Sequence, residues 1–464
     1  MKQKLIRGMA MSVALGVALP LSPIFARHMI LSPTDASSAL STKSAPDTER
    51  LRAMEVSLRR DILDAWYPRA VDTRNGGFQQ TFAADWKPLP DDKRGVVYQS
   101  RLTWVAAQAA IRAPKGSTEA KRWQETALHG LDYLSSTLWD KENGGGFYFE
   151  VAPDGKPGTE RKGEKHAYGI AFGIYAACAV YEATGDERAL TLARRAFDYL
   201  EKHAHDARNG GYTEALSRDN KPILASAVAG QNDPIGTPYG YKSMNTHIHL
   251  LEAFTALYAV DKSPAVKKRL EETFLIVRDK VAVEPGCLNL YLTPDWRAVP
   301  GHDSFGHDVE TAFLLTEAAH VLGNHDERTR TVSRSLVDHA LQYGWDATNG
   351  GFYDEGTAFG KPTVTKKVWW TQGEGLNALL LMHREYGTQT PRYKEAFDKQ
   401  WDFIARYQID AENTGWRTDV SAEGKPDPAA QKSDFWKDPY HQGRALFVVT
   451  ETLRVLEKQP AAKR

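Results

Sequence analysis

The stretch Asp346–Glu355 reads DATNGGFYDE, and versions of it recur along the chain of 464 residues. The other copies are DTRNGGF from Asp72, DKENGGGF from Asp140, DARNGGY from Asp206 and the degenerate DAENTGW from Asp410. The five starts are 68, 66, 140 and 64 residues apart, so the longest interval covers two periods. A degraded copy at Glu284–Leu290 fills that interval, and the sequence therefore predicts six repeats.

Each copy predicts a tight turn with a short hairpin, because Asn and Gly tolerate positive φ. Between copies, two stretches carry apolar residues at helical spacing, for example residues 166–186 and 187–206. The first stretch is apolar nearly all round and the second has one charged face, as expected for a buried and an outer helix. The repeats therefore predict an all-α fold over residues 47–464: an (α/α)6 barrel, with short β-hairpins at one end, forming one catalytic domain.

The composition is that of an ordinary globular protein, with 42% hydrophobic and 25% charged residues and equal numbers of basic and acidic side chains. This balance gives no reason to expect a nucleic-acid partner. The only cysteines, Cys178 and Cys287, stand in apolar surroundings. We interpret them as buried free thiols, with a single disulfide as the alternative.

Residues 1–26 have the pattern of a secretory signal peptide, since Lys2, Lys4 and Arg7 precede a short apolar run that ends near Ala26. An uncleaved membrane anchor is the alternative, but the run contains Pro20 and is shorter than the ~20 residues that span a bilayer. Residues 27–46 are rich in Ser, Thr and Pro, which predicts a flexible tether. We therefore expect a secreted or periplasmic protein that has no membrane association after cleavage; its oligomeric state is left open.

Polar residues stand at the starts of the predicted inner helices, which enter the barrel from the same end. A closed ring would bring these residues together at one mouth: Arg101, His249, His307, Glu310, Glu374 and His441. The helix amino ends also direct positive charge there, which favours anionic or developing negative groups. The alternative for each histidine is a structural role, because His307 and Glu310, like His249 and Glu252, have the spacing of a hydrogen-bonded pair on one helix.

A metal is a weaker interpretation of the same residues. His247 and His249 are two apart on a helix and therefore diverge, and there is no HExxH motif or cysteine cluster. Trp104, Trp370 and Trp436 are candidates for stacking on a sugar face, with packing in the core as the alternative.

Four motifs resemble the N-acylglucosamine 2-epimerase family, and within it the cellobiose 2-epimerase branch. They are MNTHIHLLEA from Met244, GHDVE from Gly306, WWTQGEGL from Trp369 and WKDPYHQGR from Trp436. The resemblance extends over residues 47–464. It implies the same (α/α)6 barrel and an enzyme that inverts C2 of a reducing-end sugar without a cofactor or metal.

The resemblance also implies a role for each residue of this chain that matches a position in the family's motifs. The resemblance implies that His307 and His441 form the acid/base pair and that Glu310 supports His307. It also implies that His249 and Arg101 contact the sugar near O1 and the opened aldehyde. The expected substrate-binding residues are Asn245, Tyr168, Trp370, Glu374 and Trp436.

Histidines suit this chemistry, because C2 inversion removes a proton α to the aldehyde and returns one to the other face. A group that titrates near neutrality can do both. Three alternatives stay open: an aldose–ketose isomerase that needs a single base, a glycoside hydrolase that uses Glu310 and Glu374, and a sugar-binding protein without turnover. The sequence does not identify the sugar or decide between a mono- and a disaccharide.

Overall fold

The computed structural model describes residues 45–158, 160–225, 228, 230–358, 360–387 and 389–458. The predicted signal peptide and residues 27–44 of the predicted tether lie outside the described residues. The first described helix begins at Ala45, so the last two residues of the predicted tether are helical. None of the described helices is long and apolar enough to cross a membrane.

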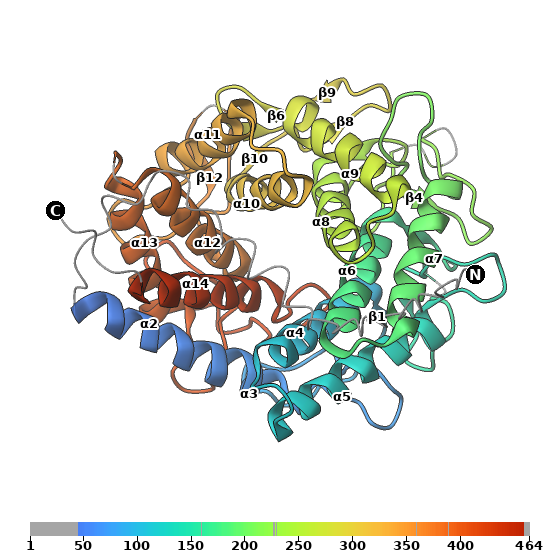
Figure 1. The fold of residues 1–464 in the computed structure, drawn as a ribbon, viewed down its shortest axis with the longest axis horizontal. Coiled ribbons are helices and arrows are strands. Elements are labelled where there is room, and N and C mark those ends of the chain that lie inside the picture. Colours follow the sequence, from blue (N-terminus) through green and yellow to red (C-terminus); the bar gives the residue numbers. More distant parts are fainter. Residues whose placement is uncertain are drawn as a thin grey trace, which may run out of the picture.

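The described chain folds into a ring of inner helices surrounded by outer helices (Figure 1). The inner helices are α4 (Val96–Arg112), α6 (Ala167–Thr184), α8 (Met244–Val260), α10 (Phe305–Leu322), α12 (Trp369–Tyr386) and α14 (Tyr440–Lys458). The outer helices are α2 (Ala45–Ser57), α5 (Thr118–Tyr133), α7 (Glu187–His203), α9 (Pro264–Ile276), α11 (Glu327–Tyr343) and α13 (Arg392–Phe403). One-turn π-helices extend four of the outer helices: η1 (Leu58–Leu63, leading into α3, Asp64–Trp66), η2 (Leu134–Leu138), η3 (Val277–Val281) and η4 (Ile404–Gln408).

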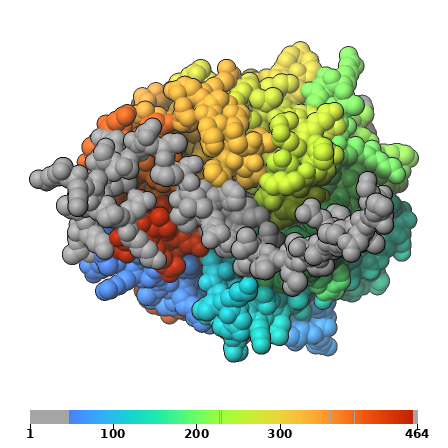
Figure 2. Space-filling view, viewed as in Figure 1, coloured from blue at the N-terminus to red at the C-terminus, as the bar shows by residue number. Residues whose placement is uncertain are grey.

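The ring closes by joining the two ends of the chain. Each inner helix packs against the next, and α14 packs against α4. The last inner helix takes α2, the first helix in sequence, as its outer partner. In Figures 1 and 2 the C-terminal residues, in red, lie beside the N-terminal helix, in blue. These contacts confirm the predicted (α/α)6 barrel of six helical pairs.

The burial of the helices follows the predicted difference between inner and outer members. Helix α6 is buried continuously from Ala167 to Val180, whereas α7 buries one face and exposes its charged residues. Cys178 and Cys287 are buried and unpaired, as predicted.

Short strands form a second ring at one end of the barrel. The strands are β1 (Arg94–Gly95), β2 (Glu150–Val151), β3 (Lys165–His166), β4 (Ala215–Leu216), β5 (Lys242–Ser243), β6 (Ala282–Val283), β7 (Cys287–Leu288), β8 (Tyr291–Leu292), β9 (Ala298–Val299), β10 (Asp303–Ser304), β11 (Glu355–Gly356), β12 (Pro362–Val364), β13 (Lys367–Val368) and β14 (Asp419–Val420). Strands β1, β3, β5, β10 and β13 each precede an inner helix and pair with a strand that follows the next hairpin. A bridge between Phe82 and Ser433 connects the first repeat to the last. All six hairpins therefore lie at the end where the inner helices begin.

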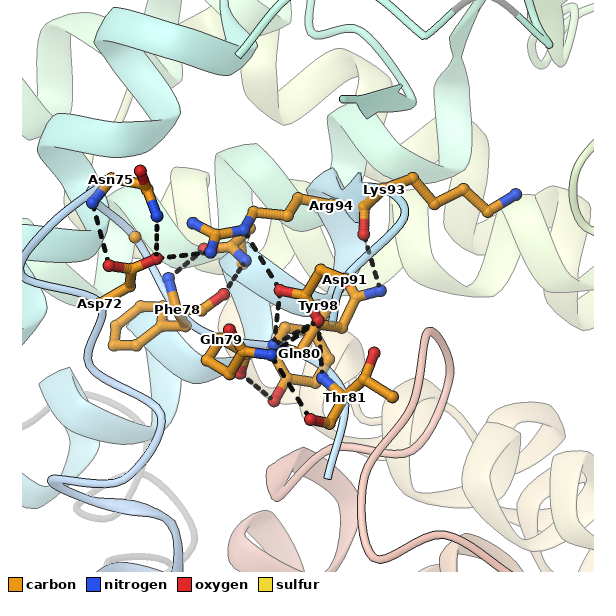
Figure 3. A network of polar contacts seen from close by, with 12 residues as sticks. Asp72, Asn75, Phe78, Gln79, Gln80, Thr81, Asp91, Lys93, Arg94 and Tyr98 are labelled. Atoms are coloured by element: carbon orange, nitrogen blue, oxygen red, sulfur yellow. Dashed lines mark hydrogen bonds and ion pairs between the residues drawn. The ribbon is translucent and has the colours of Figure 1, made fainter. Parts of the chain in front are cut away.

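The repeated Asp is the anion of a buried ion pair. In the fifth repeat Asp346 accepts from the backbone N–H groups of Thr348 and Asn349, and the Lys367 ammonium lies 2.7 Å from its other oxygen. Lys367 is fully buried and also donates to the carbonyl of Gly350 at 2.7 Å. The corresponding pairs of the other repeats are Asp72–Arg94, Asp140–Lys165, Asp206–Lys242 and Asp410–Lys432. Figure 3 shows the first repeat, in which Arg94 lies between Asp72 and Asp91.

The glycines of the motif let the turn approach this cation and the inner helix. Gly350 and Gly351 have φ values of 75° and 88°. A Cβ on Gly351 would come within 2.9 Å of the side-chain oxygen of Gln372. The motif therefore recurs because five of the six repeats fasten the hairpin to the segment before the inner helix with the same ion pair.

Candidate active site

A cavity of about 340 Å³ opens at the end of the barrel where the inner helices start. Nine of the ten predicted site residues line it: Arg101, Tyr168, Asn245, His249, His307, Glu310, Trp370, Trp436 and His441. Pro234, Ile235 and Trp369 complete the wall. The exception is Glu374, which is fully buried behind the wall.

His441 is held by a carboxylate. Its Nδ1 lies 2.7 Å from Glu374 Oε1, and among the described residues no group hydrogen-bonds its Nε2. A carboxylate accepts a hydrogen bond from Nδ1–H, so the proton of the neutral ring stays on Nδ1 and the lone pair is on Nε2. Burial lowers the pKa of His441 well below its usual value, and Arg101 acts in the same direction. Glu374 therefore contacts His441 and does not line the cavity as the sequence analysis expected.

His307 has a different partner. Its Nδ1 lies 2.8 Å from the hydroxyl of Ser304, the residue before α10, and not against the predicted Glu310. A hydroxyl can donate or accept, so either tautomer of the imidazole is allowed. Burial lowers the pKa of His307 to about 4, and Glu310 influences it only through its negative charge, in the opposite direction. The expected support by Glu310 is thus electrostatic, because its carboxylate is turned toward Arg444.

Arg444 is the central cation under the cavity floor, a role that the sequence did not indicate. One of its terminal nitrogens lies 2.5 Å from Glu310 Oε1 and 2.6 Å from Glu374 Oε1. The other contacts Glu252 and the hydroxyl of Tyr440. Three buried carboxylates from α8, α10 and α12 thus share one guanidinium from α14, which fixes the relative positions of four inner helices.

His249 and Arg101 lie on another part of the wall. His249 Nδ1 is 2.9 Å from Glu252 Oε2, so the hydrogen-bonded His–Glu pair with helical spacing is His249–Glu252 and not His307–Glu310. Burial lowers the pKa of Arg101, but Tyr168 and Asp438 more than offset this and keep it above its usual value. Arg101 Nη1 lies 3.0 Å from Asp438. Arg101 is therefore a fixed positive charge beside the cavity.

Tryptophans form the remaining surface. The ring of Trp370 lies 4.7 Å from that of His307 and 5.6 Å from that of His441, centroid to centroid, so one indole contacts both imidazoles. Trp436 is 38% exposed and stands at the rim. Trp104 instead stacks on Tyr175 below the site, at 5.3 Å. Trp370 and Trp436 are thus the available stacking faces, while Trp104 belongs to the core.

A loop supplies the wall residues that sequence reasoning missed. Pro234 and Ile235 belong to the segment between β4 and β5, and Asp233 anchors it by accepting from the backbone of Ile235 and contacting His166 Nε2 at 2.8 Å. The only sequence signal is the unusual length of this connection.

The family model for N-acylglucosamine 2-epimerase (GlcNAc 2-epimerase) matches residues 76–445. The chain belongs to this family. It is 30% identical to the cellobiose 2-epimerase of Bacteroides fragilis over 84% of this chain and 96% of that protein. It is 24% identical to the D-mannose isomerase of Marinomonas mediterranea over 84% of this chain and 94% of that protein.

A solved structure agrees with these relatives. The cellobiose 2-epimerase of Spirochaeta thermophila superposes with a TM-score of 0.77 at 31% identity, covering 90% of this chain and 99% of that one. The protein is therefore a carbohydrate epimerase or isomerase, and the family recognised from the four motifs is confirmed.

Proposed function

We propose that the protein is a sugar 2-epimerase that inverts C2 of a reducing-end aldose, with His307 and His441 as its two bases. The observation that carries the proposal is that both imidazoles contact the single ring of Trp370 in one cavity. Each uses Nδ1 for a protein partner, and among the described residues neither Nε2 has one, so both could exchange a proton with a sugar between them.

The two histidines have different hydrogen-bond partners, a carboxylate for His441 and a hydroxyl for His307, and this difference suits inversion. Glu374 gives His441 a defined tautomer and stabilises its imidazolium once a proton arrives. The hydroxyl of Ser304 adapts to either tautomer of His307, which can therefore donate or accept. Burial lowers the pKa of both histidines, which favours the neutral imidazole that removes the C2 proton. The other histidine must enter the cycle protonated, so that it can return a proton to the opposite face.

The developing negative charge needs donors on another side of the sugar. Arg101 and His249 supply them, since Arg101 is a buried cation and the Nδ1 of His249 is held by Glu252. The enediolate oxygens at C1 and C2 would lie against these groups, away from bulk water. Each turnover moves one proton off C2 to one imidazole and returns one from the other, so no external oxidant or reductant is required.

The substrate class follows from the relatives and the aromatic rim. A cellobiose-like or mannobiose-like disaccharide would place its reducing ring between the histidines and direct its second ring toward Trp436, Pro234 and Ile235. Such amphipathic surfaces suit the apolar faces of sugar rings. The signal-like residues 1–26 lead us to propose that this reaction takes place outside the cytoplasm.

Two alternatives are less well supported. A D-mannose isomerase-like reaction shares the enediolate but returns the proton to C1, so it gives a ketose and needs one base. Hydrolysis by Glu310 and Glu374 is disfavoured, because both carboxylates bind the same guanidinium and lie within 4.8 Å of one another. Carboxylates that flank a glycosidic bond stand ~5–9.5 Å apart and are not both committed to a cation.

Hydrogen exchange at C2 tests the proposal. The wild-type enzyme in D₂O should convert an aldose into its C2 epimer with deuterium at C2, followed by NMR. H307N and H441N should each abolish epimerisation, while one variant still exchanges C2 of one epimer and the other variant that of its counterpart. The single-base isomerase predicts instead a ketose product and loss of exchange from only one of the two substitutions.

A further inference from the structure

The fourth hairpin breaks the ion-pair pattern of the other five. In those five, the Asp of the motif directly follows the first residue of the hairpin bridge, as Asp346 follows Trp345 in the Trp345–Phe352 bridge. In the fourth, Ala282 pairs with Leu288, so the next residue is Val283. The partner cation is also replaced. The first, second, third and fifth repeats have Lys or Arg two residues before the inner helix, whereas the fourth has Asp303 there; the sixth takes its cation from Lys432, eight residues before α14. Both members of the buried ion pair are therefore missing here.

A different cluster occupies this place. Asp303 and Asp308 are both fully buried, and His339 of α11 is 3% exposed between them. The three offer ligand atoms that all lie within 4.8 Å of one another. Both carboxylate oxygens of Asp303 and one of Asp308 are buried, and within the described residues no cationic group and no side-chain donor other than the neighbouring carboxyl group satisfies them; the backbone N–H of Ser304 is the one further donor at Asp303.

The tautomer of His339 places a further hydrogen-bond acceptor beside the two carboxylates. Its Nε2 lies 3.1 Å from the carbonyl oxygen of Ala358, which can only accept, so Nε2 carries the proton. Nδ1 faces the two carboxylates, and in the neutral ring it presents a lone pair. Two carboxylates and a lone pair thus converge in a buried space, where only a positive species can balance them.

The distances from His339 to the two carboxylates fit a common metal ion better than a proton shared with the imidazole. His339 Nδ1 is 3.3 Å from Asp308 Oδ2 and 3.5 Å from Asp303 Oδ2. Charge-assisted hydrogen bonds are shorter, at ~2.7–2.9 Å for nitrogen to oxygen. Ligands bound at ~2.0–2.2 Å around a tetrahedral Zn²⁺ are separated by ~3.3–3.6 Å, which matches both values.

We propose that Asp303, Asp308 and His339 bind a divalent cation of the Zn²⁺ type, with solvent completing its coordination. The ion takes the place of the Lys or Arg that the other five repeats use, and it fastens the start of α10 to α11. This site is structural and separate from the proton transfer, although Ser304 and His307 directly adjoin its ligands in sequence.

Two other buried clusters serve as internal contrasts. Glu310, Glu374 and His441 already have the Arg444 guanidinium within 2.6 Å of both carboxylates. Glu214 and Asp233, which lie near His166, accept from several protein donors: Ser243, Thr246, Ile235 and Thr237. Among the described residues, only the cluster in the fourth repeat combines this proximity with two buried carboxylates that neither contact a Lys or Arg nor accept from a hydroxyl side chain.

Metal content and thermal unfolding test the proposal on the untagged, full-length protein. Wild-type protein dialysed against EDTA should bind one Zn²⁺ per chain, measured by titration against a chromophoric chelator, and its Tm should rise on reloading. D303K supplies an ammonium as in the other repeats, so it should bind no Zn²⁺ and its Tm should not respond to EDTA. H339Q should weaken binding by at least the ~10–100-fold that loss of a supporting residue causes.

H441N is the matched control, because it removes the histidine of the active-site cluster and should leave the Zn²⁺ stoichiometry at one. Loss of binding in H441N, or undiminished binding in H339Q and D303K, would assign the ion elsewhere and overturn the proposal. Failure of the wild-type protein to bind Zn²⁺ would also overturn it and leave protons as the balancing charge. If D303K does not fold, the comparison of wild type, H339Q and H441N still decides the question.

Discussion

His247 and His249 stand two residues apart on α8 but belong to different layers of the molecule. His247 lies in the hairpin layer: its Nδ1 is 2.7 Å from the carbonyl of Ser243, and its Nε2 accepts from the backbone N–H of Tyr212 at 3.2 Å. His249 lies in the cavity layer, where Glu252 holds its Nδ1 and, among the described residues, no group hydrogen-bonds its Nε2. The residue type is the same, and the difference is whether the protein uses both ring nitrogens.

The same distinction separates the two layers in general. In the hairpin layer the buried Lys367 has three oxygen acceptors within 3.0 Å, and its role is complete without a ligand. In the cavity layer, only one ring nitrogen each of His307 and His441 has a hydrogen-bond partner among the described residues. Buried charge alone therefore does not mark a functional site in this fold; incomplete use of the hydrogen-bonding groups does.

The largest expected effect is a loss of activity in a variant of Glu374, which contacts His441 but does not line the cavity. E374Q keeps the size of the side chain but removes the charge that stabilises the His441 imidazolium, so we expect kcat to fall by ~10²–10⁴-fold. The acid limb of kcat/KM should also move to lower pH, because a protonated His441 loses its carboxylate partner. Steady-state kinetics against pH measure both effects.

Glu317 provides the matched control for this prediction. It is likewise buried on an inner helix, but it lines a separate small cavity below the site and does not contact His441. E317Q should keep kcat and its pH profile. Equal losses in E317Q and E374Q would mean that buried charge acts on activity only through general stability, and the distinction between the layers would fail.

The second prediction concerns the hairpin layer. K367M leaves Asp346 buried without its cation, so the free energy of unfolding should fall by ~3–5 kcal/mol, measured by urea denaturation. The folded fraction should keep its KM, because Lys367 does not line the cavity. K221M removes an ion pair with Asp219 in which both side chains are largely exposed, and it should leave stability unchanged.

The sequence predicted what local patterns encode. The copies of the motif located five hairpins, the double interval between two of them located the fourth, and apolar periodicity located the paired helices, because all these signals are patterns along the chain. Nine of the ten predicted site residues came to one cavity for the same reason: in a closed ring, equivalent helix starts must meet.

The remaining features depend on contacts between repeats. Arg444 joins carboxylates from three other helices, and no spacing within α14 indicates this. Glu310 has the helical spacing of a partner for His307, yet the competing guanidinium attracts its carboxylate and Ser304 takes its place. Glu374 shares a helix with Trp370 but is fully buried, because it meets His441 on the neighbouring helix. Such choices among several partners are set by the tertiary arrangement.

The smallest predicted effect appears only when pH is varied, and it compares His247 with its counterparts in other repeats. Gln99 and Gln372 occupy the same position in their inner helices and accept from the backbone N–H of Phe78 and Phe352, as His247 does from Tyr212.

Burial lowers the pKa of His247 to about 4, whereas an unfolded histidine titrates near ~6.5. Between these values the unfolded chain binds the extra proton, so stability falls as pH drops from ~6.5 toward ~4. H247Q introduces the glutamine that the other two repeats have, and it removes the loss of stability that protonation of His247 causes. The free energy of unfolding should be nearly unchanged at pH 7, and at pH 5 the variant should be more stable than wild type by about 2 kcal/mol. Urea unfolding at the two pH values measures the difference, and kcat at pH 7 should be preserved. A wild type and variant that lose stability in parallel on acidification would show that His247 is not held neutral by the hairpin, and the division between the two histidines of α8 would have to be redrawn.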